Sequence, residues 1–192
     1  ITKLCEEALT FTFASVCINP IHVPLAVSIL QNEKIKVSTV VGFPLGASSS
    51  EMKFAESRFL THQGAEELEM VINIGALKQK EYGIVENDIV RVVDAADGNP
   101  VKVIIETCLL NKEEMLRACK IIINAGAAYV KTSTGFLPGG ARVEDIKLIK
   151  KNVGKNVGIK ASGGIKTLEE VNLMISAGAN RIGTSNSVYI VS

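Results

Sequence analysis

Short apolar runs rich in β-branched residues alternate along the chain with longer amphipathic segments. Seven runs have the length and composition of buried strands. They cover residues 14–19, 36–43, 67–73, 101–107, 129–134, 157–161 and 181–185. Because strands that alternate with helical patterns form βαβ units, the pattern predicts an α/β fold with a parallel sheet.

Helix boundaries are marked by residues with known capping roles. Residues 48–51 and 167–170 fit the capping box, and Asn111 precedes Glu114 with the same spacing. Glycines stand where left-handed C-caps are expected, at Gly64, Gly98, Gly126 and Gly178. No linker or low-complexity stretch interrupts this alternation, which predicts a single domain.

The number of strands narrows the choice of fold. A closed (β/α)8 barrel needs eight strands, and the chain opens at Ile1 in a helical pattern that should follow a strand. We therefore expect a TIM (β/α)8 barrel whose first strand lies upstream, so that residues 1–192 form one N-terminally incomplete domain. The alternative is an open doubly wound sheet.

Composition excludes several classes of protein. The 192 residues are 47% hydrophobic and carry a net charge of +1, which favours neither nucleic acid nor an anionic membrane as a partner. The four cysteines form no C-x-x-C pair, and no apolar run is as long as a membrane span. We expect a soluble cytoplasmic protein with free thiols.

Two lysines interrupt apolar strands at matching places. Lys131 and Lys160 lie near the ends of consecutive predicted strands, where barrels carry their catalytic groups. Burial and mutual repulsion both lower a lysine pKa, and a neutral lysine can attack a carbonyl to form a Schiff base. The alternative is that each lysine forms a structural ion pair. Lys102 is a third member of the group or a charge at a strand start.

Two carboxylates occupy similar positions. Glu69 lies inside one predicted strand and Glu106 ends another. Either could hold the lysines in place and relay protons, or could serve only as their counter-charge.

Glycine-rich turns follow the last two predicted strands. Residues 162–167, which include Gly163, Gly164 and Lys166, run into a helix, and residues 181–187 end the final strand. Backbone N–H groups in such turns bind anions, and barrels often bind phosphate there. These turns predict a phosphate site, with an ordinary glycine turn as the alternative.

Metal chemistry is disfavoured. His22 and His62 are the only histidines and lie far apart, so no zinc site of several histidines can be built. We expect neither a metal nor another cofactor. Cys17 fits a buried small hydrophobe better than a reactive thiol.

The motifs together resemble deoxyribose-phosphate aldolase over essentially the whole chain. They cover residues 14–20, 41–46, 70–77, 103–107, 130–135 and 160–165. The resemblance implies a metal-free class I aldolase that reversibly cleaves 2-deoxy-D-ribose 5-phosphate to D-glyceraldehyde 3-phosphate and acetaldehyde. It also implies a homodimer.

The resemblance assigns roles to residues. Lys131 matches the Schiff-base lysine, and Lys160 matches the second lysine, which lowers the pKa of the first. Residues around the substrate phosphate are matched by Gly135, Gly163, Gly164, Gly183 and Ser185. Thr134 and Cys17 match residues that line the pocket.

Two departures from the family pattern bear on activity. The family has an aspartate in the proton relay where this chain has Glu69, and the family's first strand, with its Asp-His-Thr segment, is not in the sequence. A catalytic group displaced by about 1 Å can lose about 100-fold in rate. Two other hypotheses therefore stay open: a different Schiff-base sugar-phosphate aldolase, and an impaired barrel that only binds sugar phosphates.

Overall fold

The structure is a computed structural model that describes all 192 residues. Seven parallel strands form one sheet in which each strand pairs with the next along the chain. The strands are β1 (Ser15–Ile18), β2 (Lys36–Val41), β3 (Glu67–Val71), β4 (Val101–Ile104), β5 (Tyr129–Lys131), β6 (Gly158–Ser162) and β7 (Arg181–Gly183). The predicted parallel α/β sheet is confirmed.

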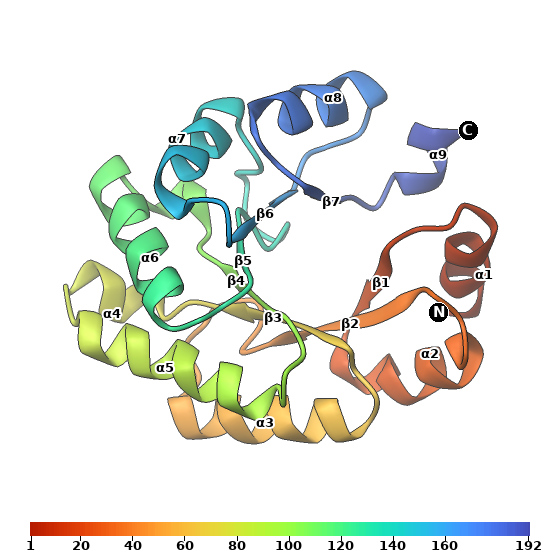
Figure 1. Cartoon of the computed structure of the whole chain (residues 1–192), viewed down its shortest axis with the longest axis horizontal. Helices are drawn as coiled ribbons and strands as arrows, with labels where there is room; N and C mark the ends of the chain where they lie inside the picture. The colour runs from red at the N-terminus through yellow and green to blue at the C-terminus, as the bar shows by residue number, and fades with distance from the viewer.

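Helices connect the strands and lie outside the sheet (Figure 1). The α-helices are α1 (Thr2–Thr10), α2 (Val23–Leu30), α3 (Ser50–His62), α4 (Ile74–Lys78), α5 (Tyr82–Ala95), α6 (Lys112–Asn124), α7 (Val143–Val153), α8 (Leu168–Ala177) and α9 (Ser187–Val191). Two short 3-10 helices, η1 (Pro20–His22) and η2 (Thr107–Leu109), follow β1 and β4. None of the helices combines the length and the hydrophobicity that a membrane span requires.

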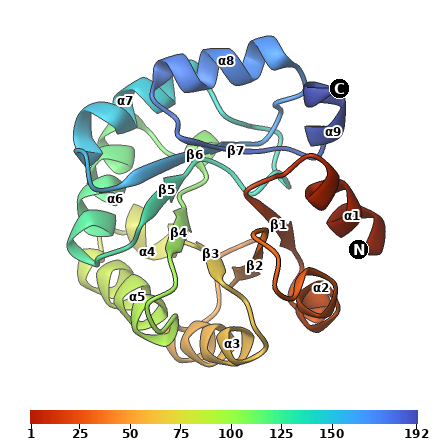
Figure 2. The same ribbon diagram turned by 45° about the vertical axis from the view of Figure 1, so that its right-hand side comes forward.

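The sheet curls into most of a barrel, with the helices around its outer surface (Figure 2). β1 and β7 are the two edge strands and do not pair with each other. The sequential strand order has no point at which the winding reverses, which excludes the doubly wound alternative. The fold is of the TIM-barrel type.

Most of the strands end earlier than the sequence predicts. β2 ends at Val41 because Gly42 has a φ of +60°, and β4 ends at Ile104, shortly before Glu106 with a φ of +52°. Left-handed residues of this kind cannot continue a strand. They turn the chain into the loops that surround the mouth of the barrel. The predicted strands were too long because they were drawn from apolar composition, which continues past these turns.

The predicted helix caps are largely present. Asn111 and Thr167 form complete capping boxes at the starts of α6 and α8. At α3 the N-cap is Ser49, one residue after the start of the predicted capping box at residues 48–51. The Ser49 hydroxyl accepts a hydrogen bond from the Met52 N–H. All four predicted C-cap glycines have positive φ angles.

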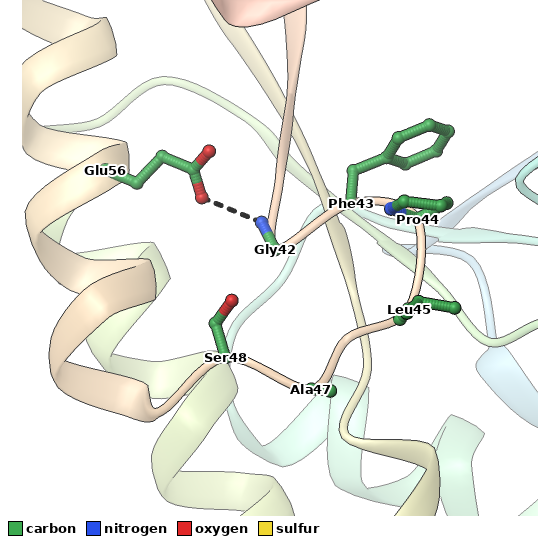
Figure 3. A pocket seen from close by; sticks show the side chains of 7 residues that line it. All are labelled: Gly42, Phe43, Pro44, Leu45, Ala47, Ser48 and Glu56. Carbon is green, nitrogen blue, oxygen red and sulfur yellow. Dashed lines mark hydrogen bonds between the residues drawn. The ribbon is translucent and has the colours of Figure 1, made fainter.

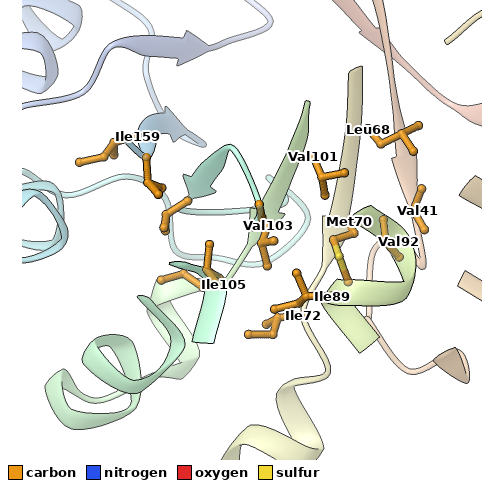
Figure 4. Packing of buried hydrophobic residues seen from close by; sticks show 14 of the residues in the cluster. Val41, Leu68, Met70, Ile72, Ile89, Val92, Val101, Val103, Ile105 and Ile159 are labelled. Carbon is orange, nitrogen blue, oxygen red and sulfur yellow. The ribbon is translucent and has the colours of Figure 1, made fainter. Parts of the chain in front are cut away.

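Alternation along the strands separates two environments. Residues such as Met70, Val103 and Ile159 point toward the helices and join a cluster of 43 buried hydrophobic residues, part of which is drawn in Figure 4. Their neighbours on each strand point into the barrel lumen, because successive side chains of a strand face opposite sides. The lumen face carries most of the buried charge.

One buried ion pair lies outside the lumen. The Lys53 ammonium on α3 contacts the Asp88 carboxylate on α5 at 2.5 Å and donates a hydrogen bond to the Val71 carbonyl at 2.9 Å. Both charged side chains are fully buried. This pair links two outer helices to the end of β3 and has no contact with the lumen lysines.

Candidate active site

Strand register brings the lumen lysines together. Lys131 on β5 is the direct register partner of Lys160 on β6, and Glu69 on β3 is the partner of Lys102 on β4. Register partners in a parallel sheet point to the same face. The four side chains therefore converge in the lumen, and each of them is at least nine-tenths buried.

Glu69 is the centre of this cluster. Its Oε2 lies 2.6 Å from the Nζ of Lys131, and its Oε1 lies 2.6 Å from the Nζ of Lys160. The Nζ of Lys102 is 3.3 Å from the same Oε1, and the Ser38 hydroxyl donates to it at 3.3 Å. One carboxylate thus contacts three ammonium groups.

The charges around Glu69 shift two pKa values in opposite directions. Burial raises the pKa of the Glu69 carboxyl, but attraction by Lys160, Lys131 and Lys102 outweighs it and holds the pKa well below its ordinary value. Burial lowers the pKa of Lys160, but Glu69 more than compensates and the net pKa is raised. The expected lowering is therefore wrong for Lys160, because the carboxylate lies between the two lysines and repulsion does not dominate.

A second layer of charge lies below the first. Glu67, two residues earlier on β3, contacts the Nζ of Lys102 at 2.5 Å through Oε2 and the Nη2 of Arg181 at 2.6 Å through Oε1. Glu67 and Lys102 are buried, and Arg181 is partly exposed. The sequence analysis assigned no role to Glu67 or Arg181. The only sequence signal for Glu67 is that it lies two residues before Glu69 and so faces the same side of the strand.

The other candidate carboxylate contacts no lysine. Glu106 accepts hydrogen bonds from the Thr134 backbone N–H at 3.1 Å and from the Thr134 hydroxyl at 2.5 Å. The Thr134 hydroxyl oxygen accepts from the Phe136 N–H at 3.2 Å. Glu106 therefore fixes the position of Thr134 at the mouth of the barrel, next to Gly135, which has a left-handed φ of +85°.

The turn after β6 offers free backbone donors. Gly163 and Gly164 have φ angles of +87° and +77°, and neither of their N–H groups, nor that of Ile165, donates to another group of the chain. Consecutive free N–H groups of this kind form an anion-binding concavity. The backbone N–H of Lys166 is already used, because it donates to Glu170 at 2.7 Å within the helix cap, so Lys166 can contribute only its exposed side chain.

The two remaining candidates lie on the opposite edges of the sheet. Cys17 on β1 is exposed, which corrects the expectation of a buried hydrophobe: its side chain lies on the lumen side of an edge strand. Ser185, just after β7, is also exposed. No group of three or more His, Cys, Asp or Glu side chains could hold a metal ion.

A separate hollow lies beside the mouth. It has a volume of about 350 Å³ and is formed by the loop that follows β2 together with Glu56 on α3 (Figure 3). Glu56 accepts a hydrogen bond from the Gly42 N–H at 2.8 Å. Phe43, on the rim, meets Phe136 edge to face with ring centroids 5.1 Å apart. None of the residues that line the hollow belongs to the lysine cluster.

Comparison with known proteins places this chain in a family. The DeoC/LacD family of aldolases matches the chain over residues 1–185. The chain belongs to this family. It is 55% identical to a deoxyribose-phosphate aldolase of Clostridium perfringens strain SM101 over 191 residues, which cover 99% of this chain and 85% of the relative. It is 54% identical to a deoxyribose-phosphate aldolase of Thermococcus kodakarensis, covering all of this chain and 87% of the relative.

Solved aldolase structures agree with the fold. One, described as QR15, an aldolase, superimposes with a TM-score of 0.94 at 41% identity, covering 98% of this chain and 85% of that one. The deoxyribose phosphate aldolase of Aeropyrum pernix, described as a tetramer, gives a TM-score of 0.92 at 29% identity, covering 99% of this chain and 81% of that one.

Gly183 leaves room for the side chain of Lys160. A Cβ atom at Gly183 would lie 2.8 Å from Cε of Lys160 and 3.0 Å from Cβ of Ser162. Gly183→Ala is therefore expected to displace Lys160. If Lys160 takes part in catalysis, kcat should fall by about 10- to 100-fold, because small displacements of catalytic groups are costly. Steady-state kinetics measure this effect.

The matched control is Gly83→Ala on α5. A Cβ at Gly83 meets no atom within 4 Å, and its φ is not left-handed. This variant should keep full activity. An unchanged kcat in Gly183→Ala would show that the added methyl group does not displace Lys160, in spite of the short distance between them.

Proposed function

We propose that the chain is a deoxyribose-phosphate aldolase that works through a Schiff base on Lys131. The observation that carries the proposal is the convergence of Lys131, Lys160 and Glu69 beside the carboxyl ends of the barrel strands, where barrel enzymes carry their catalytic groups. The relatives that match at 54–55% identity bear the same activity in their names.

The first step forms the imine. The neutral Lys131 amine attacks C1 of the open-chain aldehyde, and loss of water from the carbinolamine gives a protonated imine. Lys131 must first give up the proton with which it contacts Glu69. Because the surrounding cations hold the pKa of Glu69 low, it enters the reaction as a carboxylate that can stabilise the charged imine.

The second step breaks a carbon–carbon bond. Acetaldehyde contains C1 and C2 of the sugar, so the bond that breaks is C2–C3. A base removes the C3 hydroxyl proton, the C2–C3 electron pair moves into the imine to give an enamine, and D-glyceraldehyde 3-phosphate leaves. Protonation of the enamine at C2 and hydrolysis then release acetaldehyde and return the Lys131 amine. We propose that Lys160 and Glu69 move these protons, with water as the intermediary.

The rest of the substrate is proposed to lie along the mouth. The free N–H groups at Gly163 and Gly164 suit the phosphate, supported by Gly135, Ser185 and the side chain of Lys166. The Thr134 hydroxyl donates to Glu106 and its oxygen accepts from the Phe136 N–H, which leaves one lone pair of that oxygen to accept from a sugar hydroxyl. Cys17 lines the opposite side of the lumen.

A cleavage assay tests the proposed function. The protein is incubated with 2-deoxy-D-ribose 5-phosphate, and triose phosphate release is followed through a coupled NADH assay, with and without excess EDTA. We expect turnover that is saturable and insensitive to the chelator. Parallel reactions with unphosphorylated 2-deoxy-D-ribose, followed by acetaldehyde release because it yields no triose phosphate, and with fructose 1,6-bisphosphate should be at least about 100-fold slower, since the first lacks the phosphate group and the second offers a ketone.

Two other results would contradict the proposal. Faster cleavage of a different sugar phosphate would identify another Schiff-base aldolase. Substrate binding without turnover would identify a barrel that only binds sugar phosphates. We also propose that the enzyme is cytoplasmic and forms a homodimer. Light scattering of the purified protein measures the number of subunits.

A further inference from the structure

The lumen holds more positive than negative charge. The charged or titratable side chains that face it come from six strands and are Cys17, Glu67, Glu69, Lys102, Tyr129, Lys131, Lys160 and Arg181. Four are cationic and only two are carboxylates. How those two carboxylates are shared among the four cations therefore decides the electrostatics at Lys131.

Glu67 is fully occupied by two of the cations. Its two oxygens contact different partners, Lys102 at 2.5 Å and Arg181 at 2.6 Å. The Lys102 side chain is completely buried, and its Nζ lies 5.9 Å from the centre of the Tyr129 ring. Because a buried ammonium needs a counter-charge, Lys102 depends on the carboxylates of β3.

Lys102 also competes for Glu69. Its Nζ lies 3.3 Å from Oε1 of Glu69, the same oxygen that contacts Lys160 at 2.6 Å. Lys102 remains at the longer distance because its shorter contact is with Glu67. If Glu67 lost its charge, the nearest alternative carboxylate for Lys102 would be Glu69.

We propose that Glu67 is a positioning residue for the aldolase reaction: by holding Lys102 and Arg181, it reserves Glu69 for Lys131 and Lys160. The proposal rests on the proposed Schiff-base function. Glu67 contacts neither of the two lysines itself and acts only through Lys102.

Removal of the Glu67 charge has a directional consequence. In Glu67→Gln, Lys102 moves toward Oε1 of Glu69, Lys160 loses part of that carboxylate oxygen, and the lumen gains one net positive charge. Both changes leave more uncompensated positive charge in the lumen, which disfavours protonation of the groups that line it. The acid limb of the kcat/KM profile is therefore expected to move to lower pH by about half a unit or more, and kcat falls because Lys160 and Lys131 lose their common anchor.

Compensating variants separate this role from a purely structural one. Lys102→Met removes the competitor and one positive charge, so its acid limb should move to higher pH. Glu67→Gln/Lys102→Met restores the balance of charge, and its acid limb should return to within about 0.2 unit of the unsubstituted protein. The matched control is Glu66→Gln, which removes the neighbouring carboxylate from an exposed pair with Lys36 and should leave the profile unchanged.

The experiment measures kcat and KM against pH for all five proteins, with circular dichroism as the check on folding. Opposite shifts in the two single variants, cancelled in the double variant, support the proposal. A folded Glu67→Gln with an unmoved acid limb would overturn it, and so would a double variant that keeps the shift. If Glu67→Gln fails to fold, the pH profile of Lys102→Met tests the proposal. An acid limb of Lys102→Met that stays in place or moves to lower pH contradicts it. An inactive unsubstituted protein would contradict the proposed function instead, and the role of Glu67 would fall with it.

Discussion

Replacement of Lys131 by methionine is expected to abolish aldolase turnover, with kcat/KM lower by about 10³-fold or more. Methionine has a similar length and suits a buried position, but it has no amine to form the imine. Glu69 keeps Lys160 and Lys102 as partners, so no carboxylate is left unpaired and the fold should persist. The coupled cleavage assay measures the loss, and the melting temperature checks the fold.

The matched control for this substitution is Lys120→Met. Lys120 is an exposed lysine on α6 that makes no ion pair. It should retain full activity. Turnover by Lys131→Met within about tenfold of the unsubstituted protein would show that another group carries the covalent chemistry, and Lys160 would be the first to examine.

Replacement of Glu69 by glutamine is expected to have the largest effect on stability. Three buried ammonium groups would lose their common carboxylate, and leaving buried charge uncompensated costs roughly 3–5 kcal/mol. Urea unfolding at pH 7 measures the free energy of unfolding. Glu33→Gln, an exposed position without an ion pair, is the control and should change stability by less than about 0.5 kcal/mol.

The same variant has a characteristic pH dependence. The pKa of Glu69 is lower in the folded protein than its ordinary value of 4.5. Its stabilisation is therefore complete above about pH 4.5 and is lost as the pH falls through the lower, folded pKa. Glu69→Gln should accordingly lose less stability than the unsubstituted protein between pH 5 and pH 3. Parallel pH curves for the two proteins would contradict the assignment of charge to Glu69.

The fold and the centre of the site were visible in the sequence for a physical reason. A charged residue inside an apolar strand is costly unless it is paired or used, so Lys131, Lys160 and Glu69 stood out from their surroundings. The alternation of strands and helices then placed all three in one parallel sheet. Both signals, the alternation of apolar and amphipathic segments and the rare charged residue inside an apolar strand, can be read within short stretches of sequence.

The second layer of the site depends on contacts that local sequence does not contain. Glu67 meets Arg181 across 114 positions, and the two come together only because the sheet curls. Glu106 was predicted beside the lysines, but its left-handed backbone turns it toward Thr134 instead. The requirement for glycine at Gly183 is likewise set by the position of Lys160, which no pattern within the final strand reveals.

The most direct test of the account is to trap the imine. The protein is incubated with acetaldehyde, reduced with sodium borohydride and digested, and the modified peptides are mapped by mass spectrometry. We predict an ethyl adduct on Lys131, with Lys160 and Lys102 unmodified because they do not form the imine. A folded protein in which Lys131 stays unmodified, or in which the adduct lies on another lumen lysine, would contradict the central claim that Lys131 is the nucleophile.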